Sequence, residues 1–223
     1  MTLLALRNQL VDLATGLARK GLNRGTAGNA SLRIDADRFL VTPSGVEPHL
    51  LKPQDMVAME MDGRFSGARL PSSEWRFHRD ILAARPEVAC VVHTHAPFCT
   101  TLACLGLGIP AFHYMVAAAG GADVRCAPYA TFGTQALSDH ALTALEGRKA
   151  CLLAHHGMIA VGDTPARALK LAVELEELAE QYWRILQITP KPPLLDAAEM
   201  ERVLEKFRTY GQPRAADAES MAE

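Results

Sequence analysis

The chain of 223 residues lacks any block of like charges, because 23 Lys+Arg stand against 25 Asp+Glu and the formal net charge is -2. Without a basic stretch or tail, a nucleic-acid interface is not indicated. The five cysteines contain no C-x-x-C pair. This excludes a zinc ribbon and a disulfide framework, and it is typical of a reduced, cytoplasmic protein.

Long hydrophobic runs are also missing. Arg7 and Asp12 interrupt the apolar N-terminal stretch, so it does not have the continuous apolar core of a signal peptide. Residues 88–122 contain no Asp, Glu, Lys or Arg, but histidine, proline and glycine divide them, so no span of about 20 apolar residues is present. We expect no membrane partner, and we interpret this neutral segment as buried interior around a site.

Several catalytic motifs are absent. The chain has no G-x-S-x-G of a serine hydrolase, no Walker A motif and no G-x-G-x-x-G of a dinucleotide site. The cysteines fall mostly in apolar runs, where buried structural thiols are the commoner case. The remaining candidates for chemistry are histidines, one glutamate and small polar turns.

The apolar periodicity predicts a single α/β domain. Strands and helices follow one another without a steady βαβ rhythm, which favours a central, mainly antiparallel sheet flanked by helices. We assign residues 1–211 to this domain and expect residues 212–223 to form a disordered tail. The predicted strands are 30–34, 39–42, 56–61, 88–93, 150–154 and 158–161, and the predicted helices are 3–21, 97 onward, 133–145, 164–188, 197–207 and one opened by residues 72–74.

His93 and His95 come at the end of a predicted buried strand. Residues two apart on a strand project to the same face, about 7 Å apart, so the two imidazoles could share a metal ion. The alternative is a pair of hydrogen-bonded polar residues at a strand exit. A third histidine would favour the metal, since three histidines and an open position are typical of catalytic zinc.

The third histidine comes from His155-His156-Gly157, at the turn between two predicted strands. Glycine there would let the backbone pass close to a neighbouring group. The spacing does not decide whether His155 or His156 points inward.

Glu74 is the candidate carboxylate, and it follows two serines at a predicted helix start. Helix N-termini bind anions, although a plain helix cap explains the same residues. Together with two further donor-rich turns, the serines could hold a phosphate without a cationic side chain. These turns are Gly25-Thr26-Ala27-Gly28-Asn29 and Thr42-Pro43-Ser44-Gly45.

Eight segments together resemble the class II aldolase/adducin family, and in particular its branch that cleaves L-fuculose 1-phosphate. The resemblance extends from the first helix to Gly211. The segments are GLNRGTAGN, LVTPSG, LPSSEWRFH, VVHTHA, IPAFHYMVAAAGG, CAPYATFGT, LLAHHGMIA and LEKFRTYG.

The resemblance implies one domain in a homotetramer, with active sites at the subunit interfaces and one Zn²⁺ per subunit. It assigns His93, His95 and His156 as zinc ligands and Glu74 as both a ligand and the catalytic carboxylate. Tyr114 matches a tyrosine that protonates or steadies the aldehyde oxygen. The phosphate-binding positions are Gly28, Asn29, Ser44, Gly45, Ser72 and Ser73, and the aldehyde-positioning residues are Tyr114, Phe132, Phe207 and Tyr210.

The implied reaction is the reversible, zinc-dependent cleavage of L-fuculose 1-phosphate to dihydroxyacetone phosphate and (S)-lactaldehyde. Zinc would stabilise the negative charge of the ene-diolate fragment. One alternative changes only the aldehyde half: the substrate is then 5-deoxyribulose 1-phosphate or 5-methylthioribulose 1-phosphate, in the salvage of nucleoside by-products. More remote alternatives are a pentulose-phosphate 4-epimerase, a decarboxylase and a non-catalytic adducin-like module.

Overall fold

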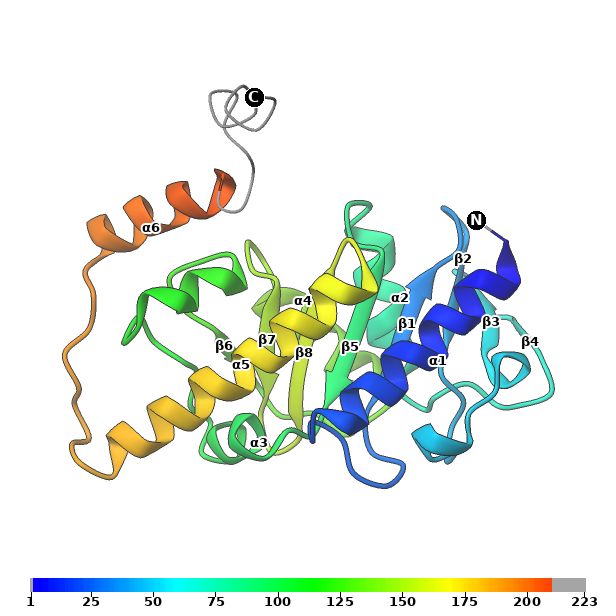
Figure 1. The fold of residues 1–223 in the computed structure, drawn as a ribbon, viewed down its shortest axis with the longest axis horizontal. Helices are drawn as coiled ribbons and strands as arrows, with labels where there is room; N and C mark the ends of the chain where they lie inside the picture. Colours follow the sequence, from blue (N-terminus) through cyan, green and yellow to red (C-terminus); the bar gives the residue numbers. More distant parts are fainter. Residues whose placement is uncertain (1, 210–223) are drawn as a thin grey trace, which may run out of the picture.

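A computed structural model describes residues 2–209. Its centre is an eight-stranded sheet in the order β4-β3-β2-β1-β5-β8-β7-β6 (Figure 1). Among the described residues, β6 and β7 form the sole parallel pair. The strands are β1 Asn29–Arg33, β2 Arg38–Val41, β3 Val57–Glu60, β4 Phe65–Ser66, β5 Cys90–Thr94, β6 Arg125–Ala127, β7 Ala150–Leu153 and β8 Gly157–Gly162.

Helices cover both faces of the sheet and give three layers (Figure 1). On one face, α1 (Leu3–Arg19) and α5 (Pro165–Leu186) lie side by side, next to α3 (Pro97–Cys104). On the other face, α2 (Trp75–Ala84) packs against α4 (Gln135–Ala144). The described chain ends with α6 (Ala197–Thr209), which packs on the short 3₁₀ helix η3 (Tyr114–Ala119).

The central strands are apolar along their whole length because both of their faces are covered. On β7, Ala150 and Leu152 belong to the core beneath α1, α3 and α5, while Cys151 and Leu153 belong to the core beneath α2 and α4. This alternation follows the two-residue period of a strand. The adjacent strands β1, β5 and β8, in the middle of the sheet, are almost completely buried.

The predicted fold class is confirmed: a single domain with a mainly antiparallel sheet between helical layers. Most predicted elements are present, with ends that differ by a few residues. The short edge strands β4 and β6 were not predicted, since two or three residues carry no readable alternation. The predicted tail, residues 212–223, lies outside the described residues.

The neutral segment 88–122 has two functions in the fold. Its β5 part is fully buried and reaches the site, whereas α3 and η3 pack on the core beneath α5. Glu176 on α5 fixes the start of α3, because its two carboxylate oxygens accept the backbone N–H groups of Phe98 (2.8 Å) and Cys99 (2.9 Å). Among the described helices, none is long and apolar enough to cross a membrane.

Candidate metal centre and active site

Three imidazoles meet at the end of β5. His93 lies on β5, His95 follows it, and His156 lies in the turn between β7 and β8. One nitrogen from each ring lies within 4.8 Å of the other two, and the Nε2 atoms of His93 and His95 are 3.1 Å apart. The sheet explains the meeting, because β5 pairs with β8 and places Thr94 opposite Met158.

The protonation of the His93 ring suits a cation. His93 Nδ1 lies 3.0 Å from the carbonyl oxygen of Met158, so Nδ1 carries the proton and Nε2 keeps a free lone pair. That lone pair points towards His95 Nε2 and the Glu74 carboxylate, whose Oε2 is 3.3 Å away. Burial lowers the pKa of His93 to about 4, so the ring is neutral and able to act as a ligand near pH 7.

Glu74 completes the cluster. It is the N-cap residue of α2, yet its side chain makes no capping hydrogen bond, so the plain-cap interpretation is wrong. Its Oε1 lies 3.2 Å from His156 Nε2. This oxygen is buried and has no hydrogen-bond donor among the described residues. A buried, unpaired carboxylate oxygen beside three imidazoles fits a divalent cation, which would satisfy all four groups.

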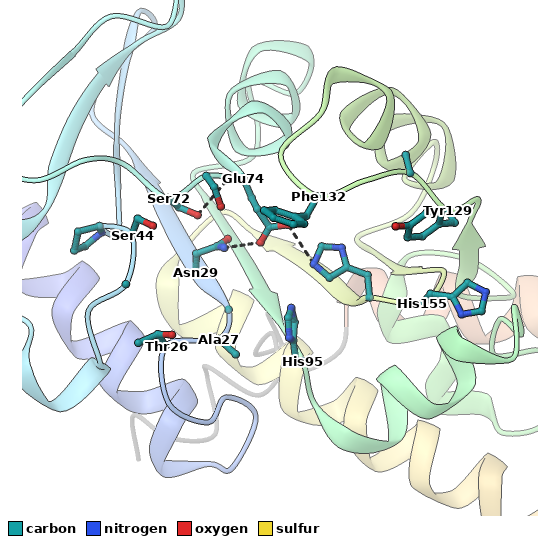
Figure 2. A pocket seen from close by; sticks show the side chains of 16 residues that line it. Thr26, Ala27, Asn29, Ser44, Ser72, Glu74, His95, Tyr129, Phe132 and His155 are labelled. Atoms are coloured by element: carbon teal, nitrogen blue, oxygen red, sulfur yellow. Dashed lines mark hydrogen bonds and ion pairs between the residues drawn. The ribbon is translucent and has the colours of Figure 1, made fainter.

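The surroundings of Glu74 favour its ionised form. Burial alone would raise the pKa of Glu74, but His93, His156 and the Asn29 amide lower it by more than burial raises it. The pKa therefore lies well below its ordinary value. The Asn29 Nδ2 group donates to Glu74 Oε2 at 2.9 Å (Figure 2). Glu74 is therefore a carboxylate at neutral pH, able to bind a cation or to accept a proton.

The β7–β8 turn separates the two adjacent histidines. His155 has φ +56°, in the left-handed region, and its ring lies edge-on to Tyr129 with the ring centroids 6.0 Å apart. His156 points instead to the cluster, 4.7 Å from the His93 ring centroid. At Gly157 a Cβ atom would lie 2.3 Å from the Thr94 carbonyl oxygen. The absence of a side chain there lets β5 and the turn approach closely.

A cavity of about 320 Å³ opens beside the cluster. In Figure 2 the donor-rich turns lie on one side, with Thr26, Asn29, Ser44 and Ser72, whereas Tyr129 and His155 lie on the opposite side. Among the described residues that line it, none is Lys or Arg. The six residues predicted to bind phosphate all line this cavity: Gly28, Asn29, Ser44, Gly45, Ser72 and Ser73.

Comparison with known proteins agrees with this geometry. Residues 8–183 match the family described as Class II Aldolase and Adducin N-terminal domain. The chain belongs to this family. It is 64% identical over 208 residues to the 5-methylthioribulose-1-phosphate/5-deoxyribulose-1-phosphate aldolase of Rhodospirillum rubrum, covering 93% of each chain.

Two further class II aldolases are similar over most of their length. The L-fuculose phosphate aldolase of Escherichia coli is 48% identical over 206 residues, which cover 92% of this chain and 95% of the relative. A solved structure named L-fuculose 1-phosphate aldolase superposes with a TM-score of 0.88 at 37% identity, covering 92% of this chain and 96% of that one. The resemblance to the class II aldolase family is thus confirmed.

Of the four residues predicted at the aldehyde end, the three that the structure describes are not brought together within one chain. Phe132 lines the cavity and is 64% exposed. Tyr114, on η3, is 51% exposed and does not line the cavity, and Phe207 on α6 lines a different hollow, with Met115 and Leu171. Tyr210 lies outside the described residues. The assignment of these residues to aldehyde positioning, at a site between subunits, stays a prediction.

Three residues of this class II aldolase site were missed by the sequence analysis: Tyr129, Ser31 and His78. Tyr129 lines the cavity opposite the donor-rich turns, beside His155, which the sequence analysis considered only as an alternative metal ligand. His78 and Ser31 are fully buried and connect through Asn29 to Glu74. A signal existed for His78, because it follows Glu74 by four residues, a spacing that places two side chains on the same side of a helix.

Proposed function

We propose that this protein is a metal-dependent aldolase that cleaves a ketose 1-phosphate to dihydroxyacetone phosphate and an aldehyde. The observation that carries the proposal is the cluster of three imidazoles beside Glu74, whose buried Oε1 has no hydrogen-bond donor among the described residues, at the edge of a cavity with a donor-rich end. We propose one Zn²⁺ per subunit, because three histidines and an open position are the usual ligand set of catalytic zinc.

The substrate that we propose first is 5-methylthioribulose 1-phosphate or 5-deoxyribulose 1-phosphate. The 64% identical relative carries that name, and this support outweighs the sequence-based expectation of L-fuculose 1-phosphate. L-fuculose 1-phosphate remains the second candidate, since the relative so named is 48% identical. The two candidates share the phosphate and ketose end and differ only in the aldehyde that is released.

The donor-rich end of the cavity suits the phosphate. Backbone N–H groups of tight turns and a helix start form a concave site for an anion, as a substitute for lysine or arginine. Gly28 and Gly45 have φ +74° and +70°, a region that favours glycine. A Cβ at Gly28 would lie 2.3 Å from the Asn23 side chain, whereas no atom lies within 4 Å of a Cβ at Gly45, where the backbone is open to a ligand. We propose that Ser44, Ser72 and Ser73 add hydroxyl donors.

Cleavage breaks the C3–C4 bond, leaves the electron pair on the dihydroxyacetone phosphate fragment, takes a proton from the C4 hydroxyl and later returns one to C3. The metal ion, when bound, supplies a Lewis acid for the oxygens on which the negative charge develops. Glu74, ionised and beside the cluster, is the group that we propose to move the proton at C3. Ser72 holds the backbone of Glu74 in place, because its hydroxyl oxygen accepts the N–H of Glu74 at 3.3 Å and its own N–H donates to the carbonyl of Thr42 at 3.0 Å.

The opposite end of the cavity would receive the aldehyde. Tyr129 and His155 line it, and Phe132 lines the same cavity; the three rings present large faces that suit an alkyl or methylthio group. We propose that Tyr114, Phe207 and Tyr210 of a neighbouring subunit complete this end in a homotetramer. Tyr114 would then protonate or steady the aldehyde oxygen.

The test measures release of dihydroxyacetone phosphate from 5-methylthioribulose 1-phosphate, 5-deoxyribulose 1-phosphate and L-fuculose 1-phosphate. Each substrate is assayed with the protein as isolated, after chelation and after zinc is returned. We expect the highest kcat/KM with one of the first two substrates, activity lost with the chelator and activity restored by zinc. A clear preference for L-fuculose 1-phosphate would favour the second candidate.

Two variants separate the residue roles. His93→Ala is expected to lose both bound zinc and activity, whereas Glu74→Gln is expected to keep much of the zinc and lose most turnover. Full activity of metal-free protein would contradict the proposal. Absence of release from all three substrates by zinc-loaded protein would instead favour the epimerase, decarboxylase or binding-module alternatives.

A further inference from the structure

Four polar side chains form a buried hydrogen-bond chain that ends at the carboxylate of Glu74, the proposed catalytic group. Ser31 Oγ lies 2.8 Å from His78 Nδ1, and His78 Nε2 lies 2.6 Å from Asn29 Oδ1. The Asn29 Nδ2 group donates to Glu74 Oε2 at 2.9 Å (Figure 2). Ser31 and His78 are fully buried and Asn29 is 9% exposed, so water does not compete for these bonds.

The chemistry of the four groups determines which atom donates and which accepts in each bond of this hydrogen-bond chain. An ionised Glu74 only accepts, so Asn29 must present its NH₂ group to Glu74 and its oxygen to His78. The Asn29 oxygen also only accepts, so His78 Nε2 must carry the ring proton. His78 Nδ1 is then a bare acceptor, and the Ser31 hydroxyl donates to it. Burial lowers the pKa of His78 to about 3, which agrees with a neutral ring carrying a single proton.

Regular secondary structure builds this chain. Asn29 and Ser31 are two residues apart on β1, so they project to the same face of the sheet. Glu74 and His78 are four residues apart at the start of α2, which packs on that face. The same register pairs Asn29 with His93 on β5, beside the metal cluster.

We propose that His78 is a positioning residue of the aldolase reaction, acting on Glu74 through Asn29. Its Nε2–H holds the Asn29 amide in the one orientation that donates to Glu74 Oε2, and this leaves Oε1 as the oxygen directed at His156 and the metal position. The inference rests on the proposed function, because it assigns His78 to the same carboxylate.

Loss of the Nε2–H donor has a specific consequence. The Asn29 oxygen would be buried without a donor, and rotation of the amide would then place this oxygen against Glu74 Oε2, where two acceptors repel each other. Glu74 would turn away from its working position. Since groups that orient metal ligands typically change activity 10–100-fold when they are lost, an effect of that order is expected on kcat.

A pair of variants separates this function from packing. His78→Gln places an amide N–H near the position of Nε2 and keeps a donor for Asn29, whereas His78→Asn places its amide near Nδ1, keeps a partner for Ser31 and leaves Asn29 without a donor. Both remove the ring, and His78→Asn also lacks one methylene group that His78→Gln keeps, so its additional loss of packing is measured by thermal unfolding. Each is compared with wild type for kcat and KM on its best substrate, bound zinc and thermal unfolding.

We expect kcat of His78→Gln within about threefold of wild type and kcat of His78→Asn lower by about 10–100-fold, with KM changed by less than about threefold in both. Equal kcat values in the two variants would overturn the inference, because only His78→Gln keeps a donor for Asn29. If wild-type protein released no dihydroxyacetone phosphate from any substrate, the proposed function would fail by that result alone.

A second measurement needs no variant and no activity. ¹⁵N NMR of metal-free protein labelled at histidine reports which ring nitrogen of His78 carries the proton. The inference requires that Nε2 carries a proton, that this proton exchanges slowly with water, and that Nδ1 carries none. A proton on Nδ1 would overturn it, whatever the substrate of the enzyme proves to be.

Discussion

Replacing Gly157 by alanine is expected to disable the metal cluster while the fold survives. An alanine Cβ would lie 2.3 Å from the Thr94 carbonyl oxygen, 3.1 Å from the His95 ring and 3.3 Å from the His93 ring. The first contact is about 1 Å shorter than ordinary van der Waals contact. Its partner is the backbone of Thr94, the last residue of β5, which is paired with Met158 on β8, so the β7–β8 turn and β5 must move apart by roughly that amount.

The expected magnitude follows from where this displacement acts. Thr94 lies between His93 and His95, and Gly157 follows His156, so a shift of about 1 Å separates the third imidazole from the other two. Overpacking in a buried site typically costs about 1–3 kcal/mol of stability. A misplacement of about 1 Å in a catalytic group costs roughly 100-fold in rate. We expect Gly157→Ala to bind zinc more weakly and to lose about 100-fold in kcat.

Gly147→Ala is the matched control. Gly147 lies in the turn before β7, at the opposite end of that strand from the cluster; it has φ +64°, and no atom lies within 4 Å of an added Cβ. The left-handed conformation costs alanine about 1–2 kcal/mol, so this variant is destabilised to a similar degree without a clash near the histidines. Release of dihydroxyacetone phosphate, zinc content and thermal unfolding are measured for both. Wild-type kcat in Gly157→Ala, or an equal loss of kcat in both variants, would refute the reasoning.

Three further predictions concern stability. Glu176→Ala should lower the free energy of unfolding, measured in urea, by about 1.5–3 kcal/mol, because the N–H groups of Phe98 and Cys99 lose a charged acceptor. Glu176→Gln should lower the free energy of unfolding by less. Equal losses in the two variants would contradict the importance of the charge. Zinc should raise the unfolding temperature of chelator-treated wild type but not of His93→Ala, and a rise in both would show that the stabilising zinc binds elsewhere. Burial lowers the pKa of His78 from 6.5 to about 3, so below pH 6.5 the unfolded protein binds a proton at this ring that the folded protein does not bind. The contribution of the neutral ring to stability is therefore complete above pH 6.5. It falls by about 1.4 kcal/mol per pH unit as the pH drops towards 3. The stability difference between metal-free wild type and His78→Gln should therefore shrink by about 2 kcal/mol between pH 6.5 and 5, and a constant difference would show that His78 does not titrate in this way.

The sequence by itself determined the elements and the types of chemistry. Apolar periodicity, proline at helix starts and polar turns located the helices and the longer strands, because these signals act within a few residues along the chain. The H-x-H spacing on a strand predicted two imidazoles on one face for the same reason. The apolar runs of β5, β7 and β8 indicated strands buried on both faces, as the two cores show.

Only the tertiary structure decided which side chains meet. The left-handed backbone of His155 turns its ring towards Tyr129 and leaves His156 facing His93, a choice that spacing left open. Glu74 had the sequence context of a helix cap, but pairing of β1 with β5 brings Asn29 and His93 within reach of its carboxylate, and pairing of β5 with β8 brings His156 there. The hydrogen bonds that connect His78 to Glu74 through Asn29 likewise depend on packing of α2 against β1. Such contacts join residues about 45 positions apart, and strand pairing and helix packing set them, so no local pattern along the sequence encodes them.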